Sequence, residues 1–531
     1  MKPQQSQVSV VVIGYNDAAH VADAVRSALA QGPAVHEVLA VDDCSTDGSG
    51  ALLDGLAADE PRLRVIRRTA NSGGCGTPRN DGIDAATAPY VMFLDSDDVL
   101  PPGAVDALLS AADEQHTEVT AGLCVRRELP SGRETPWERA LYARPALVPH
   151  PARRARLVHD TLCVNKLYRT GFLREHGIRF PEGRFRYEDF VFGARVLAAG
   201  PRIALVPDTV YVWHVRRDAD RLSISLDRAD VGNWRARTEA NRAAHDILLG
   251  AGEKGLARAV HAKFLDHELR MYTRELELRT PEHRRAWWDL TRAYLATFDA
   301  ADLTVNPTAP GRLVARVVLA SPVPRDLPRL TELAARPARL LPPYARAGDG
   351  TPVWSDDLPR ITLDHFLVRP AHLLPAAVDA ELRPRTRGTR LRLRLHELYG
   401  RLAEAGPASM DVEFVHRDDG RVGLRRQVLL RPDRYGRLWS AEAPVDLSAL
   451  GAGTWDLRLR LRFREGSARD VTAHAVAGRG LLRRRAVPDA RHGVLLVHPY
   501  RTHSGALALR TAPGWRGMTV VVRRRLRRLL H

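Results

Sequence analysis

An apolar run that ends in three carboxylates is the feature of this sequence that most constrains its fold. Residues 90–94 read Tyr-Val-Met-Phe-Leu, as expected of a strand covered on both faces, and the run continues directly into Asp95, Ser96, Asp97 and Asp98. Burying carboxylates at a strand end costs free energy unless a cation or hydrogen-bond donors meet them. Two interpretations are open at this point: a solvated acidic loop after a core strand, or a site for a metal ion or a polar ligand.

Two earlier apolar runs, residues 8–13 and 37–41, also end in polar side chains, namely those of Tyr15, Asn16, Asp42 and Asp43. Ala-rich segments with helical character separate the runs, and this alternation predicts βαβ units and a parallel sheet. In open α/β sheets the ligand crevice lies outside the carboxyl ends of the strands. The three polar clusters should therefore converge on one crevice, which favours a binding site over a solvated loop.

Two further charged positions lie near predicted helix starts. Arg79 follows a glycine-rich turn at residues 71–76, where it could contact a bound ligand or simply face solvent. Glu188 and Asp189 open an amphipathic helix, a placement that the helix dipole alone would favour. The residues by themselves leave both alternatives open.

The motifs resemble the nucleotide-sugar half of family 2 inverting glycosyltransferases with the GT-A fold. They are Val-Val-Ile-Gly-Tyr-Asn at 11–16, Val-Asp-Asp-Cys-Ser-Thr-Asp-Gly-Ser at 41–49, Asn-Ser-Gly-Gly at 71–74 and Phe-Leu-Asp-Ser-Asp-Asp at 93–98. Residues 165–169 and 180–189 are similar to the acceptor half, and residues 214–225 to the donor-covering loop, especially of wall teichoic acid polyol-phosphate glycosyltransferases. The resemblance covers about residues 7–225. It implies a Rossmann-like α/β GT-A catalytic domain with a mostly parallel sheet over residues 1–229.

The resemblance implies a UDP-sugar donor and a divalent cation, Mn²⁺ or Mg²⁺, that offsets the charge developing on the diphosphate. Asp97, the second acid of the D-x-D element, would bind the metal, and His214 would be either its remaining protein ligand or a structural residue. The other donor-binding positions are Tyr15 and Asn16, Asp42 or Asp43 at the uracil edge or ribose, Arg79 at the diphosphate or sugar, Asp95 at the ribose or metal, and Arg216 or Arg217 with Ser223 over the diphosphate.

On the acceptor side, the resemblance makes Asp189 the general base of the family's E-D motif, with Glu188 beside it. Asp189 would remove the proton of an acceptor hydroxyl as its oxygen attacks the anomeric carbon, inverting the configuration. The helix dipole and the cation should both lower the pKa of Asp189. The transferred group would be a hexose or an N-acetylhexosamine. The acceptor would be an anionic cell-envelope polymer, such as a teichoic-acid-like polyol phosphate, or its lipid-linked precursor; the alternative is a neutral polysaccharide or lipid-linked oligosaccharide.

Beyond the catalytic domain, the hydrophobic period predicts two further parts. Residues 230–350 show helical periodicity and then a connector rich in Pro and Arg. Trp287 and Trp288 are expected to pack helices together rather than to form a sugar platform. Residues 351–531 alternate apolar and Arg positions with a period of two, for example at 390–395 and 455–463, which predicts an all-β sandwich. The resemblance implies that this sandwich is immunoglobulin-like.

The charge distribution points to an anionic partner for the second half of the chain. Residues 1–230 hold 27 Lys and Arg against 31 Asp and Glu, whereas residues 231–531 hold 53 against 32. The Arg face could be ordinary solvation, a rack for a phosphate polymer, or an oligomer interface. Nucleic-acid binding is the alternative from another class, but aromatic residues are sparse among these arginines and no zinc-finger or RNP element is present.

The sequence also predicts a location in the cell. Four widely spaced cysteines without CxxC pairing, and the lack of a leader pattern or a long apolar run, predict a cytoplasmic protein with reduced thiols. The basic, partly amphipathic stretch at residues 520–530 could attach it peripherally to the inner face of an anionic membrane, or could simply be a frayed terminus.

Overall fold

The computed structural model describes residues 7–216, 228–304, 310–335, 340–341, 345–367, 370–374, 376–385, 388–397, 400–476, 484–489, 493–502 and 505–513. The chain divides into two compact units, one formed by Met1–Phe264 with Arg285–Asp302 and the other by Leu265–Arg284 with Leu303–His531. The predicted segment of residues 230–350 is therefore divided: residues 230–264 and 285–302 join the α/β part, and the others join the second unit. The predicted boundaries at residues 229 and 350 stay a prediction.

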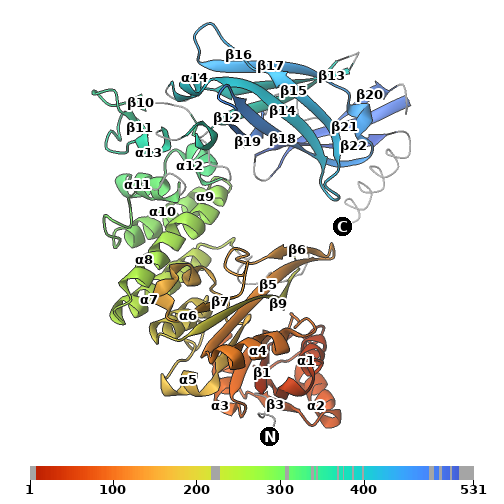
Figure 1. Ribbon diagram of the computed structural model, residues 1–531, viewed down its shortest axis with the longest axis vertical. Helices are drawn as coiled ribbons and strands as arrows, with labels where there is room; N and C mark the ends of the chain where they lie inside the picture. Colours follow the sequence, from red (N-terminus) through yellow and green to blue (C-terminus); the bar gives the residue numbers. More distant parts are fainter. Residues whose placement is uncertain are drawn as a thin grey trace. The chain divides into compact units, whose positions relative to one another are not determined.

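The first unit is built on a nine-stranded sheet with the order β3-β2-β1-β4-β8-β5-β9-β7, and β6 pairs with β5 (Figure 1). Within the described residues, β6, β7 and β8 run opposite to the other six strands. The predicted, mostly parallel α/β GT-A sheet is confirmed. The strands are β1 (Val8–Gly14), β2 (Val35–Asp42), β3 (Leu63–Arg67), β4 (Tyr90–Asp95), β5 (Val119–Leu129), β6 (Arg133–Pro136), β7 (Ala146–Val148), β8 (Lys166–Arg169) and β9 (Ile203–Arg216).

Helices cover this sheet and enclose a large apolar core. Strands β1 and β4 are mostly apolar because helices cover both of their faces. At Gly82 a helix lies so close to β1 that any side chain would collide with Val11. The helices are α1 (Val21–Leu29), α2 (Ser49–Asp59), α3 (Gly76–Ala85), α4 (Ala104–Gln115), α5 (Thr170–Glu175) and α6 (Glu188–Ala198).

The strand register brings the predicted polar clusters to one edge of the sheet. Gly14 at the end of β1 pairs with Asp42 on one side, and Ile13 pairs with Asp95 on the other. Strand β9 pairs with β5 in parallel, runs in the same direction as β1 and β4, and carries His214 at this edge. The expected convergence of strand ends is confirmed.

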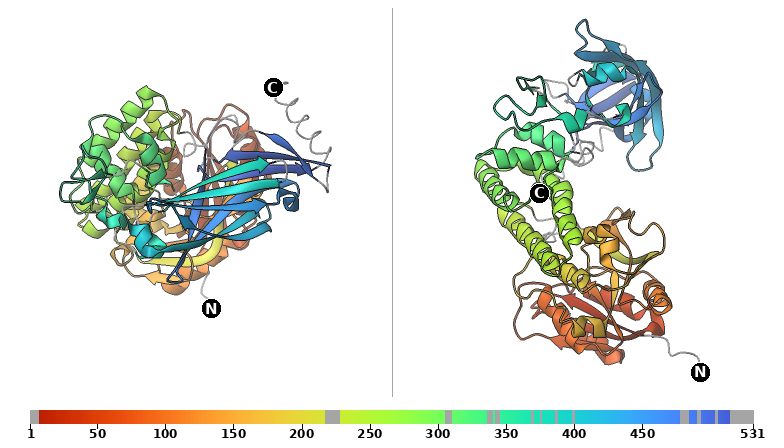
Figure 2. Two further views of the ribbon diagram at one scale, coloured as in Figure 1. Left: turned by 90° about the horizontal axis from the view of Figure 1, so that it is seen from above. Right: turned by 60° about the vertical axis from the view of Figure 1, so that its left-hand side comes forward.

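Three helices continue the first unit: α7 (Val231–Gly250), α8 (Lys254–Lys263) and most of α10 (Pro281–Leu295) (Figure 2). The Trp234 ring is fully buried and stacks on Trp287, with ring centroids 5.6 Å apart. Trp288 is also fully buried. The prediction that these tryptophans pack helices together is confirmed.

The second unit combines short helices with a β-rich domain, as predicted. Its helices are α9 (Arg270–Leu276), α11 (Gly311–Ala320), α12 (Leu327–Ala334), α13 (Asp364–Leu367) and α14 (Arg401–Ala405), and its first strands, β10 (Ala345–Arg346) and β11 (Pro352–Val353), form a separate pair. An eleven-stranded sheet follows in the described residues, with the order β16-β17-β13-β12-β19-β18-β22-β21-β20, and β14 joins β15 to β18. The immunoglobulin-like topology stays a prediction.

The strands of this sheet have one buried face, as their period of two predicts. In β13 the three leucines are buried and the arginines between them point outward. The strands are β12 (Ala377–Arg385), β13 (Gly388–His396), β14 (Pro407–His416), β15 (Val422–Leu429), β16 (Arg431–Pro432), β17 (Leu438–Val445), β18 (Gly453–Phe463), β19 (Ala468–Ala475), β20 (Arg485–Asp489), β21 (Gly493–Arg501) and β22 (Leu507–Pro513).

Carboxylates on neighbouring strands meet many of the outward arginines. Arg390 and Arg392 lie 3.5 and 3.6 Å from Glu442, Arg460 lies 3.7 Å from Asp470, and Arg462 lies 2.7 Å from Asp411. The surface is therefore a mixed array of ion pairs rather than a bare row of guanidinium groups.

Two further sequence expectations concern cysteines and membranes. Cys44, Cys75, Cys124 and Cys163 all have free thiols. Among the residues that the structure describes, no helix combines the length and the apolar character that crossing a membrane requires. The basic stretch at residues 520–530 lies outside the described residues.

Candidate active site

A buried arginine joins the carboxylates of two distant parts of the sequence. The Arg79 side chain on α3 is 3% exposed, and its Nη2 donates to Asp95 Oδ1 at 2.7 Å. Its Nη1 donates to Glu188 Oε1 at 2.6 Å and to Asp189 Oδ1 at 3.2 Å. One guanidinium thus connects the end of β4, where the donor side was predicted, with the start of α6, where the acceptor side was predicted.

The glycine-rich turn before α3 explains why Arg79 reaches this position. Any side chain at Gly74 or Gly76 would collide with backbone carbonyls of the 181–183 segment, so only glycine permits this close approach. Asn80, one residue after Arg79, exchanges two hydrogen bonds of 3.0 and 2.9 Å with the backbone of Phe180. The start of α3 and the segment leading into α6 are therefore fixed to each other.

One cation among three carboxylates leaves negative charge in a buried place. Burial, followed by the neighbouring Asp189 carboxylate, raises the pKa of Glu188 to about 7. Burial also raises the pKa of Asp189, although the Arg79 guanidinium acts in the opposite direction. The expectation that the helix dipole would lower the pKa of Asp189 is wrong, because burial outweighs the dipole here. The Arg79 contact with a donor diphosphate stays a prediction, since the guanidinium already binds three carboxylates.

Asp98, for which the sequence indicated no role, fixes strand β9 to the end of β4. Its buried carboxylate accepts the Tyr211 hydroxyl and the His214 backbone N–H, each at 2.7 Å. The Tyr211 hydroxyl in turn accepts the Asp95 N–H at 3.2 Å. Asp98 therefore holds the D-x-D element in register with His214. A signal was present in the sequence, because a third acid directly after D-x-D must be met by donors if it is buried.

Asp97 lies at the surface of this crevice. Its side chain is 45% exposed, and Arg216 Nη1 lies 3.0 Å from its backbone oxygen and 3.4 Å from its carboxylate. Partial burial, followed by the nearby carboxylates of Asp95 and Asp17, raises the pKa of Asp97 to about 6. An accessible carboxylate in negative surroundings is where a cation would be stabilised.

His214 and Asp97 together fit part of a metal site. His214 Nδ1 donates to the Asp97 carbonyl at 3.1 Å, so the neutral ring keeps its lone pair on Nε2, and burial lowers the pKa of this histidine. Within the described ranges, no three His, Cys, Asp or Glu side chains gather as a metal site. The two residues fit a hard cation that takes its other ligands from a diphosphate and water, as Mg²⁺ does. The metal itself stays a prediction.

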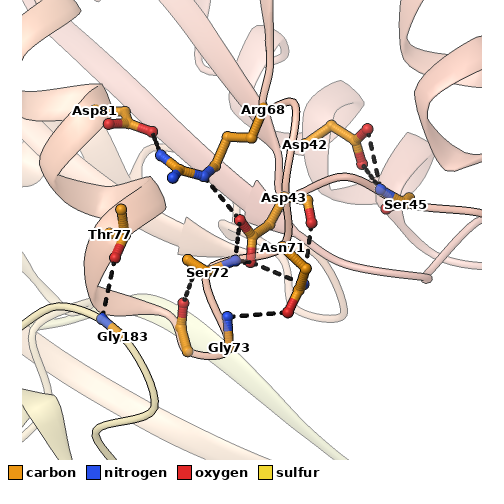
Figure 3. A network of polar contacts seen from close by, with 11 residues as sticks. Asp42, Asp43, Ser45, Arg68, Asn71, Ser72, Gly73, Thr77, Asp81 and Gly183 are labelled. Carbon is orange, nitrogen blue, oxygen red and sulfur yellow. Dashed lines mark hydrogen bonds and ion pairs between the residues drawn. The ribbon is translucent and has the colours of Figure 1, made fainter.

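The two acids at the end of β2, Asp42 and Asp43, have different surroundings (Figure 3). Asp43 accepts the Ser72 N–H at 3.1 Å, the Ser72 hydroxyl at 2.8 Å and Asn71 Nδ2 at 3.0 Å, and it forms an ion pair with Arg68, whose Nε lies 3.0 Å away. These donors saturate its carboxylate, which holds the glycine-rich turn in place. Both oxygens of Asp42 lie 3.3–3.4 Å from a single N–H, that of Ser45, so Asp42 has more capacity left for a ligand.

The end of β1 supplies one exposed ring and one loop anchor. The Tyr15 side chain is exposed, as a nucleobase contact requires. Asn16 has a left-handed backbone (φ 53°), and its Oδ1 accepts the Thr46 N–H at 2.7 Å. Asp17 accepts the Ser96 hydroxyl at 2.7 Å and so contacts the D-x-D element. The predicted donor contacts Arg217 and Ser223 lie outside the described residues.

Comparisons with known proteins agree with this geometry. Residues 9–177 match the family model described as Glycosyl transferase family 2. The chain is 32% identical over 228 residues to the succinoglycan biosynthesis protein ExoO of Rhizobium meliloti, which covers 42% of the chain and 65% of that protein. It is 29% identical over 217 residues to the poly(ribitol-phosphate) beta-N-acetylglucosaminyltransferase TarS of Staphylococcus aureus. This match covers 40% of the chain and 36% of TarS.

A third relative extends the match into the helical segment. The poly(ribitol-phosphate) beta-glucosyltransferase of Bacillus spizizenii is 27% identical over 318 residues, or 58% of the chain and 48% of that protein. The match to each of these three relatives spans less than two thirds of the relative's length.

Solved structures show the same fold. The crystal structure of S. aureus TarS matches with a TM-score of 0.55 and 18% identity over 96% of this chain and 85% of that one. A TarS fragment in complex with UDP-GlcNAc matches with a TM-score of 0.52 and 22% identity, over 65% of this chain and 96% of the fragment. The chain thus carries a glycosyl transferase family 2 domain, matched over residues 9–177 and built on the GT-A fold.

Proposed function

We propose that this protein is a metal-dependent inverting glycosyltransferase that moves a sugar from a UDP-sugar to a hydroxyl of an anionic cell-envelope polymer, such as a polyol phosphate. The observation that carries the proposal is the Arg79 guanidinium, which holds the donor-side Asp95 and the acceptor-side Asp189 at one site. The complex of TarS with UDP-GlcNAc, a structure of the same fold, supports a UDP-sugar as the donor class.

The side chains of the site have distinct tasks in this reaction. Tyr15 and Asp42 bind the uridine, and Asp97 with His214 holds the cation. A bound divalent cation stabilises the charge that develops on the UDP leaving group. Asp189 removes the proton of the acceptor hydroxyl while its oxygen attacks the anomeric carbon from the side opposite UDP, so the configuration inverts. The raised pKa of Asp189 makes it a stronger base than a solvent-exposed aspartate.

Two observations support an anionic acceptor. The names of two relatives state that they act on poly(ribitol-phosphate). Residues 231–531 hold 53 basic against 32 acidic side chains, and such an excess attracts polyanions even where individual arginines have partners.

A second candidate, transfer to a neutral polysaccharide or a lipid-linked oligosaccharide, is favoured by a different observation. Arginines of β13 and β18 are paired with carboxylates such as Glu442 and Asp411, so this face is less suited to a phosphate polymer than its arginine content indicates. In this case the β-rich domain would serve as a scaffold.

One experiment separates the two candidates. The purified chain with Mn²⁺ is mixed with UDP-glucose or UDP-GlcNAc and either poly(ribitol phosphate) or a neutral polysaccharide, and released UDP and glycosylated product are measured. Transfer to the polymer is expected. Efficient transfer to the neutral glycan with none to the polymer would favour the second candidate, and the absence of turnover with every donor would contradict the enzyme assignment.

A further inference from the structure

The segment of residues 160–169 has no role in the proposed reaction, although it carries the motif Asn165 to Arg169. Its first residue, Asp160, has a side chain that is 1% exposed. This carboxylate accepts hydrogen bonds from four side chains, namely Trp137 Nε1 at 3.1 Å, Asn165 Nδ2 at 3.2 Å, Lys166 Nζ at 2.7 Å and the Tyr142 hydroxyl. Such a set of donors holds a buried carboxylate in place.

Lys166 closes this segment into a loop. Its ammonium group reaches Asp160 near one end, Asn165 Oδ1 at 3.0 Å near the other, and the Leu162 carbonyl between them. Asn165 also donates to the Gly122 carbonyl of β5 at 2.8 Å, which fixes the loop to the sheet. Both ends of the 160–166 loop are therefore anchored to the core.

The loop presents a backbone N–H to the candidate base. The Cys163 N–H donates to Asp189 Oδ2 at 3.4 Å, and the Cys163 carbonyl accepts the Tyr168 hydroxyl at 3.1 Å. The other oxygen of Asp189, Oδ1, lies 3.2 Å from Arg79 Nη1. The carboxylate is thus held from two sides, by Arg79 and by the loop.

We propose that the Asp160–Lys166 ion pair and the Tyr168 hydroxyl are positioning residues, which hold the Cys163 N–H against Asp189 and so orient the base toward the acceptor hydroxyl. The inference rests on the proposed function, in which Asp189 is the base. Asp160, Cys163, Lys166 and Asp189 also line one mostly apolar cavity, so the loop and the base border the same space. This gives the Asn-Lys motif a function that its sequence did not reveal.

The test compares Lys166→Met with Lys254→Met, in UDP release from UDP-GlcNAc or UDP-glucose with poly(ribitol phosphate) as acceptor. Lys254 is exposed at the start of α8, so it offers the same chemical change away from the loop. We expect kcat of Lys166→Met to fall by about 10- to 100-fold, as misplacement of a reacting group does, with KM for the UDP-sugar unchanged. The Lys254→Met variant should match the wild type.

Two further variants show whether the effect passes through the base. Tyr168→Phe removes only the hydroxyl that holds the Cys163 carbonyl, and we expect its kcat to fall by about threefold to tenfold. If Lys166→Met does not fold, the kcat of Tyr168→Phe decides whether the loop positions the base. In an Asp189→Asn background, Lys166→Met should cause no further loss, because residues that act as a unit are not additive.

Unchanged kcat in both single variants, or a full additive loss in the Asp189→Asn background, would overturn this inference alone. Wild-type activity of Asp189→Asn itself would overturn the base assignment, and the inference with it.

Discussion

The active-site crevice and the β-rich domain both pair arginines with carboxylates, but in opposite ways. In the crevice, one guanidinium that is 3% exposed serves three carboxylates. On the β-rich domain, exposed arginines have acidic neighbours within the sheet; Arg462, for example, is 45% exposed and lies 2.7 Å from Asp411. Exposed pairs contribute about 0–1 kcal/mol each, whereas breaking a buried pair costs about 3–5 kcal/mol.

A functional site is therefore indicated by a buried arginine that is outnumbered by the carboxylates around it, rather than by a large number of arginines. In the crevice, burial and neighbouring carboxylates raise the pKa of Glu188 and that of Asp189 although Arg79 lies beside both, and both carboxylates can take part in proton transfer. The β-rich domain holds far more arginines, and several of them lie beside carboxylates of neighbouring strands.

Replacing Arg79 with Met should cause the largest loss. It leaves three carboxylates without their shared cation, so we expect about 3–5 kcal/mol less free energy of unfolding and no detectable transfer. Urea unfolding and UDP release would measure the two effects. A variant that keeps wild-type stability would show that the guanidinium does not compensate these acids. It would contradict the difference between the buried arginine of the crevice and the exposed arginines of the β-rich domain.

Replacing Asp97 with Ala should abolish metal-dependent donor binding while leaving the fold intact, because its side chain is largely accessible. Isothermal titration of UDP with and without Mn²⁺ would show a metal-dependent gain in the wild type and none in the variant. Equal gains in both proteins would remove Asp97 as the metal ligand.

The raised pKa of Glu188 predicts a pH dependence of stability. Its pKa is about 7 in the folded protein against an ordinary 4.5, so between these values the folded state keeps a proton that the unfolded chain has released. The free energy of unfolding should therefore fall as pH rises through this window. Glu188→Gln should flatten this slope in urea unfolding at pH 5 and pH 7.5. Glu134→Gln, an exposed control on β6, should keep it.

Replacing Arg462 with Met should have the smallest effect. Because the pair with Asp411 is exposed, we expect a change of less than about 1 kcal/mol in the free energy of unfolding and no change in UDP release with a small soluble acceptor. A loss as large as that of Arg79→Met would erase the difference between the two regions.

Most of the fold could be predicted because it depends on local patterns. Runs such as residues 90–94 are apolar because both faces of β4 are covered, and the shared direction of the strands then places Asp42 and Asp95 at one edge. The division of the helical segment between the two units could not be predicted, since it depends on which surface each helix packs against.

The site was predicted less completely than the fold. Which residues reach the crevice followed from strand ends, but their partners depend on contacts between distant segments. Arg79 was expected at a diphosphate, yet it binds acids that lie up to 110 positions away in the chain. Asp43 was a candidate ligand of the nucleotide, yet donors of the glycine-rich turn saturate it. The pKa of Asp189 depends on burial, which a local motif does not encode.

The most direct test of the central claim is transfer by Asp189→Asn. The variant and the wild type are compared in the binding of UDP-sugar and in the glycosylation of poly(ribitol phosphate), using the donor that the wild type prefers. We expect unchanged donor binding and a loss of transfer of about a thousandfold or more, because removing a catalytic base while substrate binding persists lowers kcat rather than affinity. Transfer at the wild-type rate would contradict it.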